Sequence, residues 1–371
     1  MRVASESELV EAIRSAAGPL SLRGGNTRGM AGPGTALSLA GLRGITLYEP
    51  GALTLVAQAG TPVAEIEATL AAEGQRLAFE PMDHRALMGT TGEPTIGGVF
   101  AANVSGPRRL AVGAARDFLL GVRFVDGQGN VIKNGGRVMK NVTGYDLVKL
   151  LAGSRGTLGA LTEVSLKVLP EPETSATLVL SDLYDPAAIA AMAQAMRSPF
   201  EVTAAAHDPA QRRTYLRLEG FEASVTYRIG RLKDLLAATG AALESLAAEP
   251  SITLWRDLRD VAAFHGAQGD VWRVHCRPTE APALAAKAGA EAHLYDWAGG
   301  LIRLRMAPGT DLRARLGRYD GHATLLRADE AAQALPRQEP EAPGVARLTA
   351  GLRAKFDPRG IFNAEALALS P

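Results

Sequence analysis

The sequence predicts an α+β protein built from two successive parts, and three observations favour this class. Helical and strand-like segments alternate along the whole chain. Glycine-rich loops are concentrated in the first half, at residues 23–29, 92–98 and 153–159. A proline-rich segment at residues 170–175 is expected to be a linker, and the pattern of elements changes beyond it.

Composition excludes several classes of protein. The 371 residues carry a net charge of +1 and are 47% hydrophobic, which is typical of a globular protein with two or more domains. A near-neutral charge argues against a nucleic-acid groove or an acidic membrane surface as the main partner. The single cysteine, Cys276, excludes an internal disulfide framework and is expected to be a small buried residue. No signal region and no apolar run of ~20 residues is visible, so we expect a cytoplasmic protein.

The first half is expected to combine amphipathic helices with short strands. Residues 61–74 give the clearest helix, with Thr61 as its cap, Pro62 at the first position and Gly74 after the last turn. Residues 118–136 predict a hairpin that turns at Asp-Gly-Gln-Gly. Further helices are expected within residues 5–18 and 141–159, and strands within residues 19–24, 36–42, 45–51, 53–60 and 160–170.

The second half predicts one sheet with helices on one face. A second linker is expected over residues 332–344, followed by an amphipathic helix and a turn at Asp357-Pro358. Strands are expected within residues 177–180, 200–206, 215–220, 223–230, 271–276, 292–298 and 301–307, and helices within residues 189–196, 232–249, 280–290 and 311–319.

The segment LRGGNTRGMAGPG, residues 22–34, is the first candidate for binding a ligand. Consecutive glycines allow several backbone N–H groups to lie on one concave side, and Arg23 and Arg28 add positive charge. This combination suits a phosphate or pyrophosphate, although a glycine-rich segment can also be only a turn. The segment is neither a Walker A loop nor a G-x-G-x-x-G fingerprint. Three such loops in one half of the chain are more than turns alone require.

A set of motifs in a fixed order gives a specific resemblance. LRGGNT, LTLVAQAGTPVAEIEATLAAEG, TIGGVFAANVSGPRR and KNVTGYDLVKLLAGSRGTLGALTEVSLKVLP follow one another within residues 1–170. In this order they resemble the FAD-binding domain of the vanillyl-alcohol oxidase (PCMH-type) superfamily. SGPRR, VMKNVTGYDL, LYDWAGGLIRLR, GHATLLR and the closing FDPRGIFN resemble, within it, the FAD-binding subunits of bacterial glycolate oxidase complexes.

The resemblance implies a fold and a set of cofactor-binding residues. It implies a PCMH-type FAD-binding domain of two α+β subdomains over residues 1–170. An α+β cap domain, an antiparallel sheet with helices, would follow over residues 176–334, and a C-terminal helical segment over residues 343–371 would pack back on the FAD domain. The implied pyrophosphate loop is Arg23, Gly24, Gly25, Asn26 and Thr27; the implied flavin and ribityl path is Pro81, Thr95, Ile96, Gly97, Gly98, Asn103 and Gly106; and Gly156, Leu158, Gly159 and Leu161 would lie near the isoalloxazine or the adenine.

The chain also departs from its relatives at informative positions. Members with covalent flavin carry His or Cys in the cofactor loops, where this chain has Asn26, Thr27, Ala102 and Asn103, so we expect non-covalent FAD. Many relatives have a third glycine at the position of Asn26. Relatives that oxidise 2-hydroxy acids carry a histidine-rich metal and base cluster. No metal site is predicted here, because none of the six histidines is spaced as a metal pair.

Several single residues keep two interpretations. His322 falls near an active-site Glu-His-Gly segment of relatives and is either a base facing the flavin or a strand-end surface residue. Arg108 and Arg109 either bind an anionic group or form a surface or subunit contact. Tyr145 is expected to be a buried ring that braces the fold. Trp255, Trp272 and Trp297 are expected in the core or at an interface.

The function that the resemblance implies is that of an oxidoreductase subunit. We expect an FAD-binding flavoprotein of a multi-subunit 2-hydroxy-acid (glycolate or D-lactate) dehydrogenase complex. Its role would be electron transfer or assembly, beside a catalytic flavoprotein and an iron–sulfur subunit, with membrane association only through the complex. One alternative is a self-sufficient FAD-dependent 2-hydroxy-acid oxidoreductase with His322 as base. Another is a structural subunit whose FAD site has lapsed.

Overall fold

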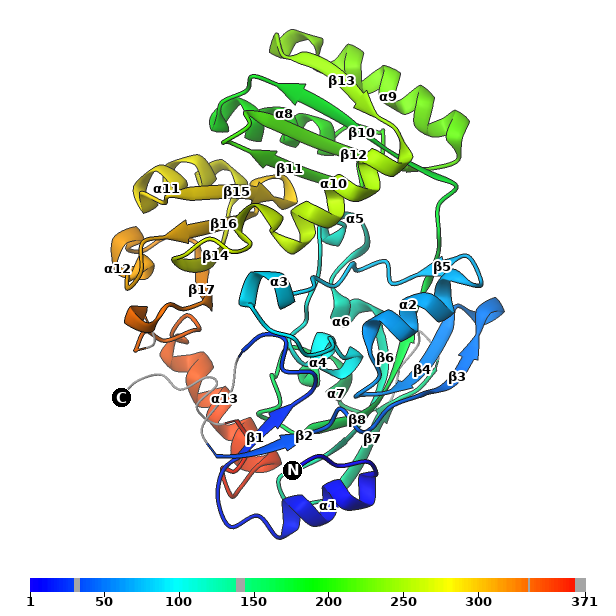
Figure 1. Ribbon diagram of the computed structural model, residues 1–371, viewed down its shortest axis with the longest axis vertical. Helices are drawn as coiled ribbons and strands as arrows, with labels where there is room; N and C mark the ends of the chain where they lie inside the picture. The colour runs from blue at the N-terminus through cyan, green and yellow to red at the C-terminus, as the bar shows by residue number, and fades with distance from the viewer. Residues whose placement is uncertain (30–33, 138–143, 333, 364–371) are drawn as a thin grey trace. The chain divides into compact units, whose positions relative to one another are not determined.

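A computed structural model of the chain describes residues 1–29, 34–137, 144–332 and 334–363 (Figure 1). Its contacts group the chain into two units. The first unit contains Met1–Ser105, Gly113–Glu171 and Pro340–Pro371, and the second contains Gly106–Val112 and Pro172–Glu339. The segment LRGGNTRGMAGPG is described except for residues 30–33, and VMKNVTGYDL is described only from Gly144. Each unit has its own sheet and its own core.

An antiparallel sheet of five strands forms the larger layer of the first unit. Its order is β3-β4-β8-β6-β7, and β8 lies at the centre with six of its eight residues buried. The predicted hairpin is confirmed as β6 and β7, and the Asp126 carboxylate accepts hydrogen bonds from the N–H groups of Gln128 and Asn130 in its turn. The strands are β3 (Ile45–Glu49), β4 (Thr54–Gln58), β6 (Leu119–Val125), β7 (Val131–Gly135) and β8 (Ala160–Lys167).

A smaller layer of the first unit holds the first glycine-rich segment. Strands β1 (Leu20–Arg23) and β2 (Thr35–Ser38) pair in parallel, and helix α1 (Glu6–Arg14) packs Leu9 and Ile13 into their core. The Ser5 hydroxyl caps α1 by accepting from the N–H of Glu8. Because β1 ends at Arg23, the loop that follows begins at a fixed place.

Short helices connect the strands of the first unit. Residues 63–71 form the clearest predicted helix, but Thr61 is not its cap, because the Thr61 hydroxyl donates to the Gln58 carbonyl and Pro62 stands at the cap. The remaining elements are α2 (Val63–Ala71), α3 (Arg85–Met88), α4 (Ile96–Ala101), α6 (Ala115–Phe118), α7 (Leu147–Leu151), α13 (Pro343–Phe356), β5 (Gln75–Arg76) and β9 (Leu169–Pro170).

The second unit is an eight-stranded antiparallel sheet with the order β13-β10-β12-β11-β15-β16-β14-β17. Helices α8, α9, α11 and α12 contribute to one core with one face of the sheet, while Trp255 of α10 packs on the other face. The elements are β10 (Thr174–Ser181), β11 (Ala204–Asp208), β12 (Arg213–Gly220), β13 (Ala242–Leu246), β14 (Asp270–Cys276), β15 (Ala292–Asp296), β16 (Leu301–Met306), β17 (Gly321–Arg327), α5 (Arg109–Val112), α8 (Asp185–Met196), α9 (Glu222–Leu236), α10 (Ala248–Asp260), α11 (Ala281–Ala288) and α12 (Leu312–Leu316).

Three predictions in the second unit are wrong. Helices were expected on one face of the sheet, but Trp255 of α10 packs on the other face. Residues 223–230, expected as a strand, lie in helix α9, where Val225, Ile229 and Leu232 recur at helical spacing and fill the core. Residues 242–246, expected within a helix, form the edge strand β13, because tertiary pairing with β10 overrides local propensity there.

Three further expectations have clear outcomes. Tyr145 is not a buried brace, because its ring is 88% exposed. Trp255, Trp272 and Trp297 are buried, as expected. Cys276 is only half-buried, and burial raises the pKa of its thiol to about 12. The α+β class is confirmed, whereas the domain boundaries expected at 170, 176, 334 and 343 stay a prediction.

Candidate functional site

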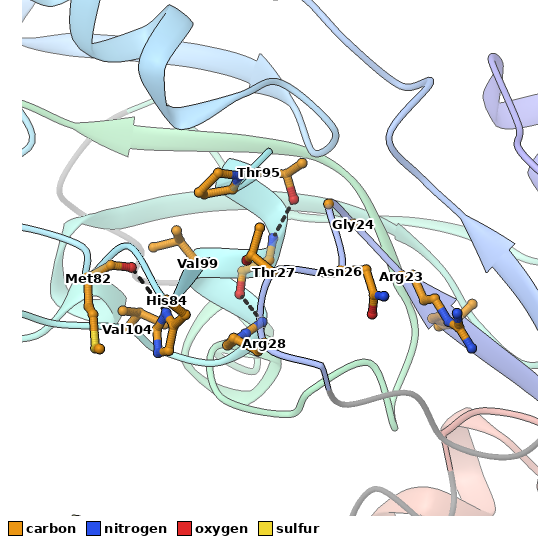
Figure 2. A pocket seen from close by; sticks show the side chains of 14 residues that line it. Arg23, Gly24, Asn26, Thr27, Arg28, Met82, His84, Thr95, Val99 and Val104 are labelled. Atoms are coloured by element: carbon orange, nitrogen blue, oxygen red, sulfur yellow. Dashed lines mark hydrogen bonds between the residues drawn. The ribbon is translucent and has the colours of Figure 1, made fainter. Parts of the chain in front are cut away.

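The three glycine-rich segments meet in the first unit. One cavity, here the first cavity, is lined by residues of all three segments, including Gly24, Gly98 and Gly156. A second cavity shares Arg23, Gly24 and Arg28 with it and extends to Met82, His84, Val99 and Val104 (Figure 2). Two cavities that share one glycine-rich loop suit an elongated ligand whose middle part lies on that loop.

Glycine is required where the first and second segments touch. A Cβ atom on Gly25 would lie 1.5 Å from the Glu93 carbonyl oxygen, and one on Gly92 would lie 1.7 Å from the Gly25 carbonyl oxygen. A Cβ atom on Gly24 would lie 2.3 Å from Oγ1 of Thr95. The two backbones therefore pack directly on each other, and no side chain fits between them.

Asn26 stands where many relatives are expected to have a third glycine, and its backbone conformation explains why asparagine fits there. Its φ is 54°, in the left-handed region that glycine adopts freely and that asparagine tolerates better than most residues. The side chain of Asn26 is exposed, and the residue lines the second cavity. Asn26 can therefore keep the loop conformation that a third glycine would give.

Helix α4 supplies the second segment. Figure 2 shows Thr95 and Arg28 each joined to its backbone by a hydrogen bond: Oγ1 of Thr95 accepts from the Gly98 N–H at 3.3 Å, and Nη2 of Arg28 donates to the Gly98 carbonyl at 2.8 Å. A Cβ atom on Gly97 would lie 2.6 Å from the Cβ of Ala59, so the helix packs closely against the end of β4. These contacts hold the first two segments together.

The positive charge of this site has no acidic partner within the described part of the chain. Burial and the neighbouring Arg155 lower the pKa of Arg28 to about 10, and burial also lowers the pKa of Arg155. Neither guanidinium forms an ion pair with a carboxylate among the described residues, and both line the first cavity. An anion bound in the cavity would compensate these charges.

Most of the residues that the resemblance implied for the cofactor line these cavities. Pro81, Ile96, Asn103 and Leu158 do not line them, although Pro81, Ile96 and Leu158 are buried next to residues that do. Gly106 belongs to the second unit, where its carbonyl accepts from Nε1 of Trp297 at 3.0 Å. The residues found at the cavity walls are Arg23, Gly24, Gly25, Asn26, Thr27, Thr95, Gly97, Gly98, Gly156, Gly159 and Leu161.

Other residues line the cavities without having been predicted to do so. They are Arg155, Met82, His84 and Asn363, together with Arg28, for which only a positive charge was expected. Nδ1 of His84 lies 3.1 Å from the Met82 carbonyl oxygen, which fixes the orientation of the ring. Arg155 lies in the third glycine-rich segment and Asn363 ends the quoted motif FDPRGIFN, whereas Met82 and His84 lie outside the quoted motifs.

The remaining candidates lie in the second unit. His322 is exposed near the start of β17 and stacks on His275 of β14, with 4.5 Å between ring centroids. Burial, Arg273, His322, Arg109 and Arg303 lower the pKa of His275 to about 2.

The two arginines of SGPRR have different surroundings in the second unit. Arg108 is buried and forms an ion pair with Glu219, which Arg217 also contacts at 3.4 Å. The guanidinium of Arg109 lies 4.7 Å from the ring centroid of Trp297. Arg108 is therefore committed to a contact inside the chain.

In the described ranges no group of three or more His, Cys, Asp or Glu residues is arranged to hold a metal ion. None of the helices in those ranges is both long and apolar enough to cross a membrane.

Comparisons with known proteins agree with the cofactor-binding geometry. The family described as FAD binding domain matches residues 1–135, so this part of the chain is an FAD-binding domain. The chain is 34% identical over 351 residues to the glycolate oxidase subunit GlcE of Escherichia coli (strain K12), covering 93% of this chain and 91% of that protein. It is 46% identical over 85 residues to the glycolate oxidase subunit GlcD of Bacillus subtilis (strain 168), covering 23% of this chain and 18% of that protein.

Solved structures confirm the fold. An alkyldihydroxyacetonephosphate synthase matches 98% of this chain and 76% of its own, with a TM-score of 0.71 at 17% identity. A p-cresol methylhydroxylase matches 98% of this chain and 87% of its own, with a TM-score of 0.69 at 13% identity. At such identities the likeness shows the fold alone, and it confirms the predicted α+β, PCMH-type class.

Proposed function

Because this chain belongs to the family of the glycolate oxidase subunit GlcE, we propose that it is the FAD-binding subunit of a multi-subunit 2-hydroxy-acid dehydrogenase. The observation that carries the proposal is the meeting of three glycine-rich segments around Arg28 and Arg155. These arginines have no carboxylate partner among the described residues. A dinucleotide brings the two negative charges of its pyrophosphate, and its two ring systems would occupy the two cavities that share the loop.

Different residues of the chain would hold different parts of FAD. Backbone N–H groups of Arg23–Thr27 would receive the pyrophosphate, and Arg28 and Arg155 would balance its charge. The apolar walls formed by Val99, Val104 and Met82 would exclude water from one ring system. When bound, FAD would supply a redox centre that can take up electrons from the catalytic flavoprotein and pass them on.

We propose that this FAD is held without a covalent bond. The two cofactor loops offer no His or Cys, but His84 at the wall of the second cavity is a nucleophile to be tested. Acid precipitation of the native protein is expected to leave the flavin in the supernatant. A yellow pellet that becomes colourless in His84→Ala would overturn non-covalent binding and identify the attachment site.

The proposed partners are a catalytic flavoprotein and an iron–sulfur subunit. Two relatives are described as subunits of a glycolate oxidase, which supports assembly into a complex. The substrate would be glycolate or D-lactate, and the flavin of this chain would pass electrons or support assembly. We place the complex in the cytoplasm, and any association of this chain with a membrane would be made through the complex. Cell fractionation of the native protein tests the location, and co-purification tests the partners.

The central experiment uses the native protein and the purified chain. We expect equimolar FAD in the chain and no anaerobic bleaching by glycolate or D-lactate until the partner subunits are added. A chain that takes up no FAD even when FAD is supplied would overturn the proposal in favour of a structural subunit. Bleaching of the isolated chain would overturn the need for a catalytic partner.

A matched pair of glycine variants tests the loop assignment. Gly25→Ala is expected to abolish FAD retention, because the new Cβ atom collides with the Glu93 carbonyl and separates the two segments. Gly18→Ala is the control, since a Cβ atom there meets nothing within 4 Å. Equal flavin content in both folded variants would contradict the assignment.

A self-sufficient oxidoreductase is the second candidate. The observation that favours it is the stack of His322 on His275, with Arg273 and Arg303 near enough to affect the charge of His275. Arginines could hold a substrate carboxylate while His322 takes the hydroxyl proton. This candidate predicts that glycolate or D-lactate bleaches the isolated chain and that His322→Ala abolishes bleaching while FAD content stays unchanged.

A further inference from the structure

The closing segment FDPRGIFN, residues 356–363, has no role in the function proposed above. After the second unit the chain returns to the first unit and runs beside β1. The Leu20 N–H donates to the Ile361 carbonyl at 2.7 Å, and the Asn363 N–H donates to the Leu20 carbonyl at 3.2 Å. Ile361 and Phe362 are buried in the same core as α1 and β2. The segment is therefore an integral part of the layer that holds the first glycine-rich segment.

Two charged side chains fix the position of this segment. The Asp357 carboxylate accepts from the N–H groups of Ile361 at 3.1 Å and Phe362 at 2.7 Å. The Arg359 guanidinium donates to the carbonyls of Ile13 and Gly127. Asp357 shapes the turn and Arg359 ties it to two other parts of the first unit, so Asn363 arrives at a defined place.

Asn363 connects two of the three glycine-rich segments. Its Oδ1 accepts from the Leu22 N–H at 2.8 Å, and its Nδ2 donates to the Arg155 carbonyl at 2.9 Å. Leu22 directly precedes the first segment, Arg155 lies in the third, and all three residues line the first cavity. One side-chain amide thus bridges backbone groups that are more than 130 residues apart in the sequence.

The side chain of Asn363 is closely packed against the third glycine-rich segment. A Cβ atom on Gly156 would lie 3.0 Å from Nδ2 of Asn363, and Gly156 has a φ of 76°. Asn363 itself has a φ of 34°, which asparagine tolerates. The bridge uses an acceptor and a donor on two separate atoms of one short side chain, and the amide of asparagine provides both.

We propose that Asn363 is a positioning residue of the cofactor site: it sets the spacing of the first and third glycine-rich segments and thereby the affinity for FAD. The proposal rests on the proposed FAD function. It adds that the site is complete only when the C-terminal segment has returned to the first unit, although the glycine-rich motifs all lie within residues 1–170.

The test compares Asn363 with an asparagine that makes the same kind of bridge elsewhere. Asn134 donates from Nδ2 to the Tyr145 carbonyl at 3.1 Å and accepts at Oδ1 from the Leu147 N–H at 3.0 Å, and it lines neither of the two cavities. Titration of the full-length apoprotein with FAD is expected to give a Kd about tenfold higher for Asn363→Ala. Asn134→Ala is expected to stay within about twofold of the native Kd.

A charge variant provides a second measurement. Asn363→Asp keeps the acceptor for Leu22 but loses the donor to Arg155 and adds a negative charge to a cavity that would receive a pyrophosphate. Its Kd should rise at least as much as that of Asn363→Ala, and this variant decides the question if the alanine variant does not fold. An unchanged Kd in the folded Asn363 variants, or an equal rise in Asn134→Ala, would overturn the proposal.

Hydrogen exchange of the apoprotein separates this proposal from the proposed function. Asn363→Ala should speed amide exchange in residues 20–29 and 153–159, whereas Asn134→Ala should not. A native chain that binds no FAD but shows this exchange pattern would refute the FAD function and keep the spacing role of Asn363. A chain that binds FAD but shows no change in exchange in Asn363→Ala would refute the spacing role alone.

Discussion

The two units surround the charges of their arginines in opposite ways. In the first unit, Arg28 and Arg155 line the first cavity, and none of the described carboxylates pairs with them. In the second unit, Arg108 and Arg217 are each 4% exposed and flank the carboxylate of Glu219. The second unit gives its buried arginines a carboxylate within the chain, whereas the first leaves room for an anionic ligand. The surroundings of an arginine, more than its burial, therefore indicate whether it binds a ligand.

Removing the negative charge of Glu219 in the second unit should have the largest effect on stability. Glu219→Gln keeps the shape of the side chain but leaves two buried guanidinium groups without a negative charge between them. We expect the free energy of unfolding to fall by about 3–5 kcal/mol, measured by urea denaturation. Glu222→Gln on the exposed start of α9 is the control and should change it by less than about 0.5 kcal/mol. Equal losses in the two variants would show that the Glu219 network is not structural.

Removing an arginine of the first unit should affect binding more than stability. In Arg28→Met no described carboxylate loses a partner, and the stability of the apoprotein should change by no more than about 1 kcal/mol, the value of the bond to Gly98. The Kd for FAD should rise about ten- to hundredfold, or about 1.4–2.8 kcal/mol. Arg231→Met on the surface of α9 is the control. A strongly destabilised apoprotein with an unchanged Kd would reverse the comparison.

The sequence allowed the elements with strong local signals to be predicted. The Ser5-capped helix α1 and the hairpin that turns at Asp126 depend on contacts within a few residues, and both are present. Strand β13 was mistaken for a helix because it depends on pairing with β10, which local patterns do not report. Helix α9 was mistaken for a strand although Val225, Ile229 and Leu232 recur at helical spacing. The secondary structure of an element that depends on partners distant in the sequence was therefore harder to predict.

In the candidate site, too, some residues could be predicted from a motif and others could not. Glycines such as Gly25 and Gly97 were recognisable because a backbone that must approach another backbone needs glycine, and a motif records this need. Arg155 and Asn363 were missed because each acts through a partner that only the fold brings near. His84 was missed because it lies between motifs.

The smallest effect is expected for Asp185 at the start of α8. Like Glu219, it is a carboxylate of the second unit with partners in the same unit. Its carboxylate accepts from Nε2 of His293 at 2.9 Å and from Oη of Tyr295 at 2.6 Å, while Nε2 of His207 lies 3.7 Å away. Burial alone would raise the pKa of Asp185, but His207, His293 and Tyr295 together lower it well below its ordinary value of 3.8. His207 and Tyr295 also form the pair that joins β11 to β15.

Because the folded pKa of Asp185 is the lower one, its stabilisation is fully present above about pH 4 and is lost as the pH falls below the ordinary value of 3.8. Asp185→Asn should therefore lower the free energy of unfolding by about 1 kcal/mol near neutral pH, and the difference from the native protein should shrink as the pH falls from 4 toward 2. The control is Asp182→Asn, whose side chain is 77% exposed and should give a small difference at every pH. If Asp185→Asn and Asp182→Asn gave the same pH profile, the internal pairing of Asp185 would contribute nothing to stability, and the contrast between the two units would rest on Glu219 alone.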